Sequence, residues 1–165
     1  MDCHSFYQSP IGPLLLVSNG VELTGLWTEK LLQKHLTELQ QDDLPLFLSV
    51  KAWLDDYFSG KNPDLSHIPL NPSGSAFQQL IWKLLLEIPY GQSVSYGYLA
   101  KQAALLMDKQ AMSAQAVGNA VGKNPISILI PCHRVLGATG KLTGYAGGLD
   151  IKSSLLKLEG ITALP

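Results

Sequence analysis

The chain has 165 residues, of which 46% are hydrophobic and 15% charged, and its formal net charge is −1. This length suits one ordinary domain or two small ones, and the composition excludes a fibrous or disordered protein. No apolar run approaches the roughly 20 residues of a membrane span, and residues 1–4 lack the basic and apolar regions of a signal peptide. We therefore expect a soluble protein without membrane partners.

The cysteines and the charge distribution indicate the compartment and the kinds of partner that we expect. Two cysteines, Cys3 and Cys132, are too few for a disulfide scaffold, which favours the reducing cytoplasm. Cys3 and His4 could form half of a metal site, but no other ligand has a suitable spacing, so we expect no metal. Residues 1–74 carry a charge of −5 and residues 75–165 a charge of +4, which is a modest signal for a polyanion partner.

Residues 6–9, 14–18 and 21–27 are short apolar runs and are predicted as strands, with Asn19-Gly20 as a hairpin turn. Residues 29–40 and 47–58 carry apolar side chains at helical spacing. Both are predicted as amphipathic helices whose stripes lie in the core, and the aromatic pair Trp53 and Tyr57 fits packing better than a binding groove. We assign residues 1 to about 60 a scaffold role.

Residues 59–74 are rich in Gly, Pro, Asn and Ser and are predicted as a linker. A helix follows over residues 75–88, with Ser73 or Ser75 as its cap, and it ends before Pro89 because proline disfavours helical backbone in the preceding residue.

Two further helices are predicted over residues 96–106, capped by Ser95, and over residues 112–121. Because a short connection joins them, they indicate a helix-turn-helix. One face of the second helix carries Ala114, Val117, Ala120 and Val121, and another carries Gln115, Gly118, Asn119 and Gly122. This second face is bare, because two of its four residues are glycines. It therefore fits close packing, either against another helix of the protein or in a DNA minor groove about 6 Å wide.

Reactive side chains are most concentrated at residues 124–135, where an apolar run between two prolines is followed by Cys132, His133 and Arg134. We predict a buried strand over residues 126–130, ended by Pro131, which has no N–H to continue a ladder. A nearby imidazole and guanidinium favour the reactive thiolate, but in an extended chain neighbouring side chains point apart. His133 therefore assists Cys132 only through a turn or a bridging water. An inert, buried cysteine is the alternative.

Residues 136–148 contain five glycines and are predicted as a loop that can bring backbone amides close to a planar ligand. The loop lacks the strand-to-helix context of a phosphate-binding loop. A final helix is expected over residues 151–159, with Asp150 as its N-cap, Gly160 as its C-cap, and its leucines packed inward. These leucines are Leu155, Leu156 and Leu158.

With the helix pair, Pro131-Cys132-His133-Arg134-Val135 and the glycine-rich loop in this order, residues 75–160 resemble the O6-alkylguanine-DNA alkyltransferases. The match includes Asn124-Pro125 upstream and Gly144-Tyr145-x-Gly147-Gly148-Leu149 downstream. The resemblance implies an α/β (α+β) fold. Residues 1–74 would be a small ribonuclease-H-like scaffold domain with the linker, and residues 75–165 a mostly helical domain for DNA binding and alkyl acceptance.

The resemblance implies irreversible, single-turnover transfer of an alkyl group from O6-alkylguanine in double-stranded DNA to Cys132, after base flipping and without a cofactor. O4-alkylthymine is a further candidate substrate. His133 would accept the thiol proton through a water, and Glu159 would orient the imidazole. Asn124 would hold the turn before the motif, and Tyr96 would protonate the leaving guanine. The residues implied for substrate and DNA binding are Gln115, Gly118, Asn119, Arg134, Val135, Tyr145, Ala146 and Gly147.

One position departs from the family's pattern. In the family an arginine of the second helix fills the gap that the flipped base leaves, and here Gln115 occupies that position. Glutamine can hydrogen-bond the orphaned base but carries no charge. We therefore expect weaker, less salt-dependent DNA binding, with the chemistry retained.

Two other functions stay open. A DNA-binding regulator would sense alkylation at Cys132 and would be expected to carry a regulatory domain. A thiol hydrolase or redox protein using Cys132 and His133 would turn over small esters or oxidise reversibly. An alkyltransferase, acting as a monomer, would instead take up one equivalent of the alkyl group and then stay inactive.

Overall fold

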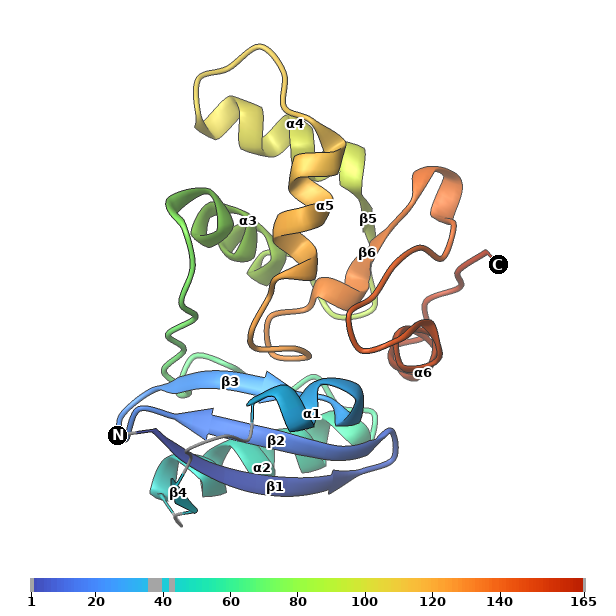
Figure 1. The fold of residues 1–165 in the computed structure, drawn as a ribbon. Helices are drawn as coiled ribbons and strands as arrows, with labels where there is room; N and C mark the ends of the chain where they lie inside the picture. Colours follow the sequence, from blue (N-terminus) through green and yellow to red (C-terminus); the bar gives the residue numbers. More distant parts are fainter. Residues whose placement is uncertain (1, 36–39, 42–43, 165) are drawn as a thin grey trace. The chain divides into compact units, whose positions relative to one another are not determined.

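The computed structural model describes residues 2–35, 40–41 and 44–164. They form two compact units, Met1–Ser73 with Pro125–Ser127 and Gly74–Asn124 with Ile128–Pro165 (Figure 1). Within the described ranges, no helix combines the length and apolar character needed to cross a bilayer.

A four-stranded sheet in the order β3-β2-β1-β4 forms the centre of the first unit (Figure 1). Its strands are β1 (Cys3–Ser9), β2 (Gly12–Ser18), β3 (Leu23–Trp27) and β4 (Gln40–Gln41). The first three are antiparallel neighbours, while β4 pairs parallel with β1. The predicted hairpin is confirmed. The Asn19 side chain accepts hydrogen bonds from the N–H groups of Val21 and Glu22, and Gly20 takes the positive φ of 102° that the turn needs.

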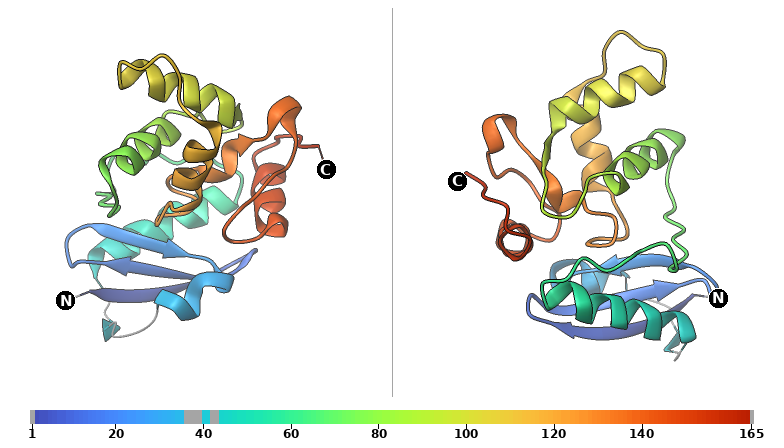
Figure 2. Two further views of the ribbon diagram at one scale, coloured as in Figure 1. Left: turned by 45° about the horizontal axis from the view of Figure 1, so that its top comes forward. Right: turned by 180° about the vertical axis from the view of Figure 1, so that it is seen from behind.

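Helix α2 (Pro45–Phe58) lies along one face of this sheet (Figure 2, right view). As predicted, it buries one apolar stripe, and Trp53 and Tyr57 stack within it, with ring centroids 5.3 Å apart. In β2, three successive leucines are fully buried. Because neighbouring side chains of a strand point to opposite faces, both faces of β2 are covered.

Helix α1 (Glu29–His35) differs from its prediction. None of its residues is buried, although a core stripe was expected, because two turns of helix offer few side chains to any one face. Leu31 and Leu32 are half-buried, and His35 stacks on Trp27 with 3.6 Å between ring centroids. The rest of the predicted stripe, at residues 36 and 39, lies outside the described residues.

The predicted linker has no helix or regular strand in residues 59–73, but it packs closely. Leu23 pairs with Leu70 as an isolated bridge, and Ile68 is buried. Pro125–Ser127 also pairs with β3, since the Leu26 N–H donates to the Pro125 carbonyl at 2.9 Å and the Leu26 carbonyl accepts from Ser127.

The predicted strand over residues 126–130 is wrong. Ile126 makes one isolated bridge, and the chain then turns, with Ile128 at a φ of 73°. All five residues are buried, as expected. Apolar composition therefore predicted burial correctly, but positive φ at a β-branched residue is incompatible with strand geometry.

Three helices form the body of the second unit. They are α3 (Ala76–Leu86), α4 (Tyr96–Leu106) and α5 (Ala114–Gly122), and each contacts the other two. Helices α4 and α5 follow one another across a short connection, as predicted for a helix-turn-helix (Figure 1). The buried Trp82 Nε1–H of α3 donates to the Ala120 carbonyl of α5 at 2.9 Å, which fixes α5 on α3.

Serine side chains begin all three helices. Ser75 forms a capping box with Gln78, and Ser95 accepts from the Tyr98 N–H, both at predicted caps. Ser113 caps α5, which begins two residues later than predicted. Ala114, in its first turn, is exposed, although Val117, Ala120 and Val121 on the same face are buried. The reason is that the first turn of a capped helix can extend beyond the surface it packs on.

The remaining elements surround the predicted reactive segment. They are β5 (Val94–Ser95), the 3₁₀ helix η1 (Cys132–Arg134), β6 (Val135–Leu136), the 3₁₀ helix η2 (Ala138–Gly140) and α6 (Leu149–Leu158). Strands β5 and β6 pair in parallel. Gly148, not Asp150, precedes α6. Asp150 lies in its first turn, where a carboxylate still favours the helix dipole. Leu155 and Leu156 are buried as predicted, whereas Leu158 is only half-buried.

Candidate active site

The backbone turns sharply where the reactive residues begin. Pro131 has φ −81° and ψ 66°, and the Cys132 N–H donates to the Ile130 carbonyl at 2.8 Å, which is an inverse γ-turn. The 3₁₀ helix η1 follows directly. Cys132 and His133 therefore do not point to opposite faces as they would in a strand, so the predicted requirement for a turn is met. The Asn124 Nδ2–H donates to the same Ile130 carbonyl at 2.8 Å and ties the end of α5 to this turn.

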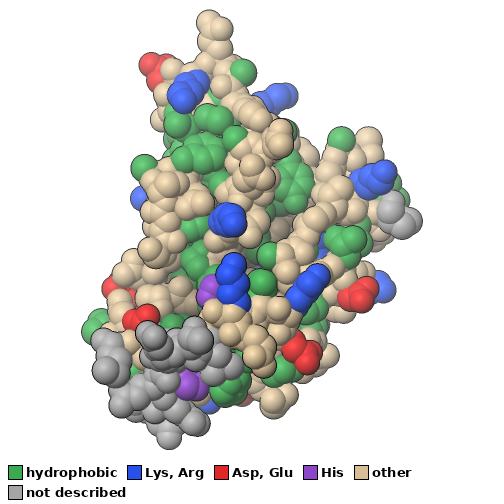
Figure 3. All heavy atoms as spheres, in the orientation of Figure 1, with side chains coloured by type: hydrophobic (Ala, Val, Ile, Leu, Met, Phe, Trp, Pro, Cys, Tyr) green, Lys and Arg blue, Asp and Glu red, His purple; other side chains and the backbone are tan. Residues whose placement is uncertain are grey.

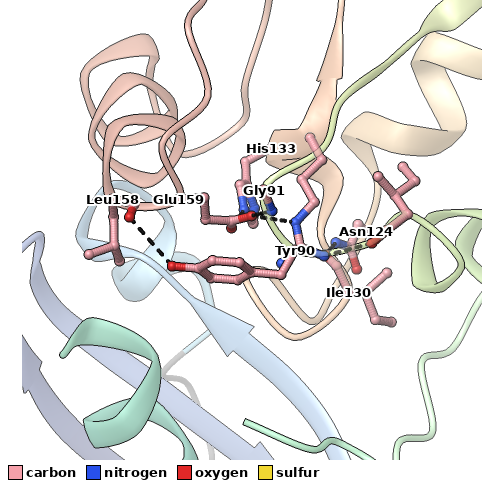
Figure 4. A network of polar contacts seen from close by, with 9 residues as sticks. Tyr90, Gly91, Asn124, Ile130, His133, Leu158 and Glu159 are labelled. Atoms are coloured by element: carbon pink, nitrogen blue, oxygen red, sulfur yellow. Dashed lines mark hydrogen bonds and ion pairs between the residues drawn. The ribbon is translucent and has the colours of Figure 1, made fainter. Parts of the chain in front are cut away.

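Glu159, at the end of α6, is the centre of a buried polar network (Figure 4). Its Oε2 lies 2.5 Å from His133 Nε2, and its Oε1 accepts from Arg134 Nε at 2.7 Å. The Gly91 N–H donates to Oε1 as well, at 3.1 Å. The carboxyl side chain is fully buried, and a buried carboxylate needs such partners to remain ionised.

Arg134 belongs to this network. It is only 8% exposed, its Nη1 donates to the Ile88 carbonyl at 2.7 Å, and its guanidinium lies 5.7 Å from the centre of the Tyr90 ring. The structure therefore directs the Arg134 side chain into the unit, and its expected contact with substrate or DNA stays a prediction. The physical reason is that the buried Glu159 carboxylate holds the chain's single arginine inside the unit.

Burial shifts the titration of both reactive groups. It raises the pKa of the Cys132 thiol, which the neighbouring Asn124 amide and the Lys152 charge oppose. It lowers the pKa of His133, and the hydrogen bond to Glu159 opposes that shift. At neutral pH the arrangement therefore holds a thiol and a neutral imidazole, which is a base able to accept the thiol proton.

Tyr96, the first residue of α4, is half-buried, and burial raises its pKa, so the phenol retains its proton at neutral pH. Gly118 of α5 lies against this ring, since a Cβ added there would be 3.8 Å from Tyr96 Cδ1 and Cε1. Gln115, Asn119 and Gly122 are exposed. The bare face of α5 is therefore directed partly at Tyr96 and partly at solvent.

The other residues predicted to contact substrate lie in β6 and in the glycine-rich loop. Val135 and Gly147 are buried, Tyr145 is half-buried and Ala146 is exposed. No cluster of three or more His, Cys, Asp or Glu side chains in residues 2–35, 40–41 and 44–164 is placed to hold a metal ion.

Lys152 of α6 was not predicted as a site residue. Its side chain is fully buried, and its Nζ donates to backbone carbonyls near the site. The signal was present in the sequence, because Leu155 and Leu156 follow Lys152 by three and four residues. That spacing places the lysine on the buried stripe of the helix.

A helix-turn-helix in the same compact unit as a buried cysteine, histidine and glutamate is the arrangement expected of a DNA-binding protein that uses a thiol in its chemistry. The family model of the 6-O-methylguanine DNA methyltransferase DNA-binding domain matches residues 76–161, and the model of that family's ribonuclease-like domain matches residues 3–72. The chain belongs to the 6-O-methylguanine DNA methyltransferase family. The predicted family and fold class are thereby confirmed.

Individual relatives agree. The chain is 45% identical over 161 residues to a methylated-DNA--protein-cysteine methyltransferase of Haemophilus influenzae, covering 96% of this chain and 86% of the relative. It is similar to the crystal structure of the Mycobacterium tuberculosis O6-methylguanine methyltransferase, with 42% identity, a TM-score of 0.83, and coverage of 96% and 93%. The structure of Mycobacterium tuberculosis OGT in complex with DNA matches with 42% identity, a TM-score of 0.81, and coverage of 94% and 91%.

Proposed function

We propose that this protein repairs DNA by moving the alkyl group of O6-alkylguanine irreversibly onto the sulfur of Cys132. The observation that carries the proposal is the buried Cys132, His133 and Glu159 set at a backbone turn, in the same unit as the helix-turn-helix. Methyl transfer from DNA to a protein cysteine is the activity named for the relatives of this chain.

The first step is activation of the thiol. The Glu159 carboxylate accepts the hydrogen of His133 Nε2, which makes Nδ1 the basic position of the imidazole. Nδ1 accepts the Cys132 proton through one water. Arg134 and the Gly91 N–H both donate to Oε1, so that Oε2 is held toward the imidazole. Arg134 is thus a positioning residue in this proposal.

In the second step the Cys132 sulfur attacks the alkyl carbon. A carbon–sulfur bond forms, the bond from that carbon to O6 breaks, and its electron pair passes to the guanine. The Tyr96 hydroxyl hydrogen-bonds the base and supplies a proton, which its raised pKa has kept in place. The proton taken up by His133 returns to the Tyr96 phenolate through solvent, which restores both groups. The products are a thioether at Cys132 and an unmodified guanine, with no cofactor consumed.

The guanine is recognised by backbone groups of Cys132, Val135 and Ala146, with Tyr145 as a wall of the pocket and Gly147 allowing close approach. The nucleotide must first leave the duplex, because the O6 carbon inside the base stack cannot align with a buried thiol. Unstacking a weakly paired O6-alkylguanine costs less than unstacking a normal base.

For duplex binding we propose that α5 enters the minor groove. Gly118 and Asn119 would lie along the groove, and Gln115 would fill the gap in the stack. On the face drawn in Figure 3, basic side chains appear as separate spots over the second unit and not as one patch. This fits the modest charge of +4 for residues 75–165 and a DNA affinity that depends weakly on salt.

We also infer the roles of the two domains, the oligomeric state and the compartment. Residues 1–74 serve as a scaffold, and residues 75–165 bind DNA and accept the alkyl group. The protein acts as a monomer. The cytoplasm is its compartment, and the support for this is the low content of two cysteines in 165 residues.

The test is the intact mass of the protein after incubation with a duplex oligonucleotide that contains O6-methylguanine. We expect a gain of one methyl group, mapped to Cys132 by peptide digestion, and no further uptake with excess DNA. Cys132→Ala should abolish the gain, while the matched control Cys3→Ala should retain it. Repeated turnover, or a methyl group found elsewhere, would refute the proposal and favour a thiol hydrolase.

A further inference from the structure

Thr143, in the glycine-rich loop, is held at two points. Its carbonyl accepts from Lys152 Nζ at 2.7 Å. Its methyl group lies against the bare backbone of Gly137, since a Cβ added there would be 3.0 Å from Thr143 Cγ2. A β-branched side chain has few χ1 rotamers, so fixing the methyl group also fixes the direction of the hydroxyl.

The Thr143 hydroxyl oxygen is buried, although the residue as a whole is half-buried. Within the part of the chain that the structure describes, no group makes a hydrogen bond of ordinary geometry to this oxygen. Few buried hydroxyls in proteins lack a partner, because the lost hydration is costly. A buried hydroxyl fixed in this way is therefore placed for a hydrogen bond that forms during the reaction.

The group beside this hydroxyl is the Tyr96 phenol. The Tyr96 ring lies against Gly118 of α5, and its centre is 5.9 Å from Lys152 Nζ, the same atom that holds the Thr143 carbonyl. Burial raises the pKa of Tyr96, interaction with the Thr143 hydroxyl lowers it, and the Cys132 charge raises it. A hydroxyl favours a phenolate by donating its hydrogen to the phenolate oxygen.

We propose that Thr143 is a positioning residue for alkyl transfer, whose hydroxyl donates to the Tyr96 oxygen while Tyr96 passes its proton to the leaving guanine. The Tyr96 O–H bond breaks, the proton goes to the guanine, and Thr143 keeps its own proton. A hydrogen bond to the charged phenolate is stronger than one to the neutral phenol, so the contact favours the transition state over the resting protein. The inference rests on the proposed function.

The test is a double-mutant cycle of Thr143→Val and Tyr96→Phe, measured as single-turnover methyl uptake at Cys132 from an O6-methylguanine duplex. Thr143→Val keeps the branched shape and removes the hydroxyl. We expect it to react about tenfold more slowly than the wild type, as the loss of one hydrogen bond does. In the Tyr96→Phe background, which has no phenol, the same change should leave the rate unaltered.

Two further variants complete the comparison. Thr143→Ser restores the hydroxyl and should recover most of the lost rate. Thr162→Val, at an exposed threonine of the same unit, is the matched control and should react like the wild type. Since the Thr143 hydroxyl has no partner of ordinary geometry in the resting protein, Thr143→Val should not lower the urea midpoint of unfolding.

Three results overturn the inference while leaving methyl transfer to Cys132 intact. The first is a Thr143→Val protein that reacts at the wild-type rate. The second is a Tyr96→Phe protein that does so. The third is an equal slowing by Thr143→Val in both backgrounds, which would show that Thr143 acts through packing and not through Tyr96. If the wild type takes up no methyl group at all, the proposed function fails and this inference fails with it.

Discussion

The two units bury different kinds of side chain. In the first unit, the sheet and α2 bury hydrocarbon and aromatic residues, with a few serines and His4 among them. In the second unit, burial extends to Arg134, Lys152 and Glu159, which are the buried charged residues within the described ranges. Apolar burial stabilises a fold, whereas buried charges cost desolvation that their partners must offset. The second unit therefore buries charged side chains that the stability of the fold does not require and that the proposed chemistry does.

The substitution with the largest expected effect on this contrast is Glu159→Gln. The change removes the negative charge that Arg134 and His133 share, and it leaves a buried guanidinium without a counter-charge. We expect a loss of about 3–5 kcal/mol in the free energy of unfolding. Alkyl transfer by the folded fraction should fall by about 100-fold or more, because the imidazole is no longer oriented. Urea unfolding and single-turnover kinetics measure the two effects.

Glu87→Gln is the control for that change, since Glu87 is exposed at the end of α3. It should alter neither quantity measurably. Equal effects of the two substitutions would show that net charge, and not the buried network, determines the rate.

The second test removes packing from the first unit. Leu54→Ala deletes a fully buried side chain of α2 and should lower the free energy of unfolding by about 2–5 kcal/mol. Leu48→Ala, on the same helix but 68% exposed, should change it by about 0.5 kcal/mol or less. Under conditions where both variants are folded, their methyl-transfer rates should match that of the wild type. A tenfold slower Leu54→Ala reaction would contradict a purely scaffolding first unit.

Much of the fold was predictable because local signals and tertiary contacts agree. The Asn19-Gly20 turn, the α2 stripe and the serine caps at Ser75 and Ser95 each depend on a few neighbouring residues. The strand over residues 126–130 failed because an apolar run specifies burial and not φ, and the positive φ of Ile128 has no local signal.

The candidate site shows the same limit. Adjacent residues Cys132 and His133 could be recognised as reactive from the sequence, and the need for a turn between them could be stated. The buried position of the Arg134 side chain could not be predicted, because its ion-pair partner Glu159 lies 25 residues further along the chain. Lys152 was missed since a lysine on an apolar stripe is expected to extend its charge to water, whereas here three backbone carbonyls receive it.

The third test uses pH to detect the buried imidazole. Burial lowers the pKa of His133 below its ordinary 6.5, so on acidification the unfolded chain binds a proton before the folded protein does. Stability from this group is present above pH 6.5 and is lost as the pH falls toward the folded-state pKa. The slope approaches about 1.4 kcal/mol per pH unit at most. Urea unfolding between pH 5 and 7 should show this slope in the wild type and in the exposed control His67→Asn, but not in His133→Asn.

The smallest expected effect concerns the exposed face of α5. Gln115→Arg adds a charge at the first turn of a helix proposed to enter the minor groove, where Gln115 is exposed. We expect about fivefold tighter DNA binding at low salt, near 1 kcal/mol, and a salt dependence steeper by about one counterion. Gln110→Arg adds the same charge in the exposed connection before α5 and is the matched control. An equal gain in both variants would mean that added charge alone tightens binding. A gain confined to Gln115→Arg, with the methyl-transfer rate at saturating DNA unchanged, would separate groove binding by α5 from the buried chemistry of Cys132.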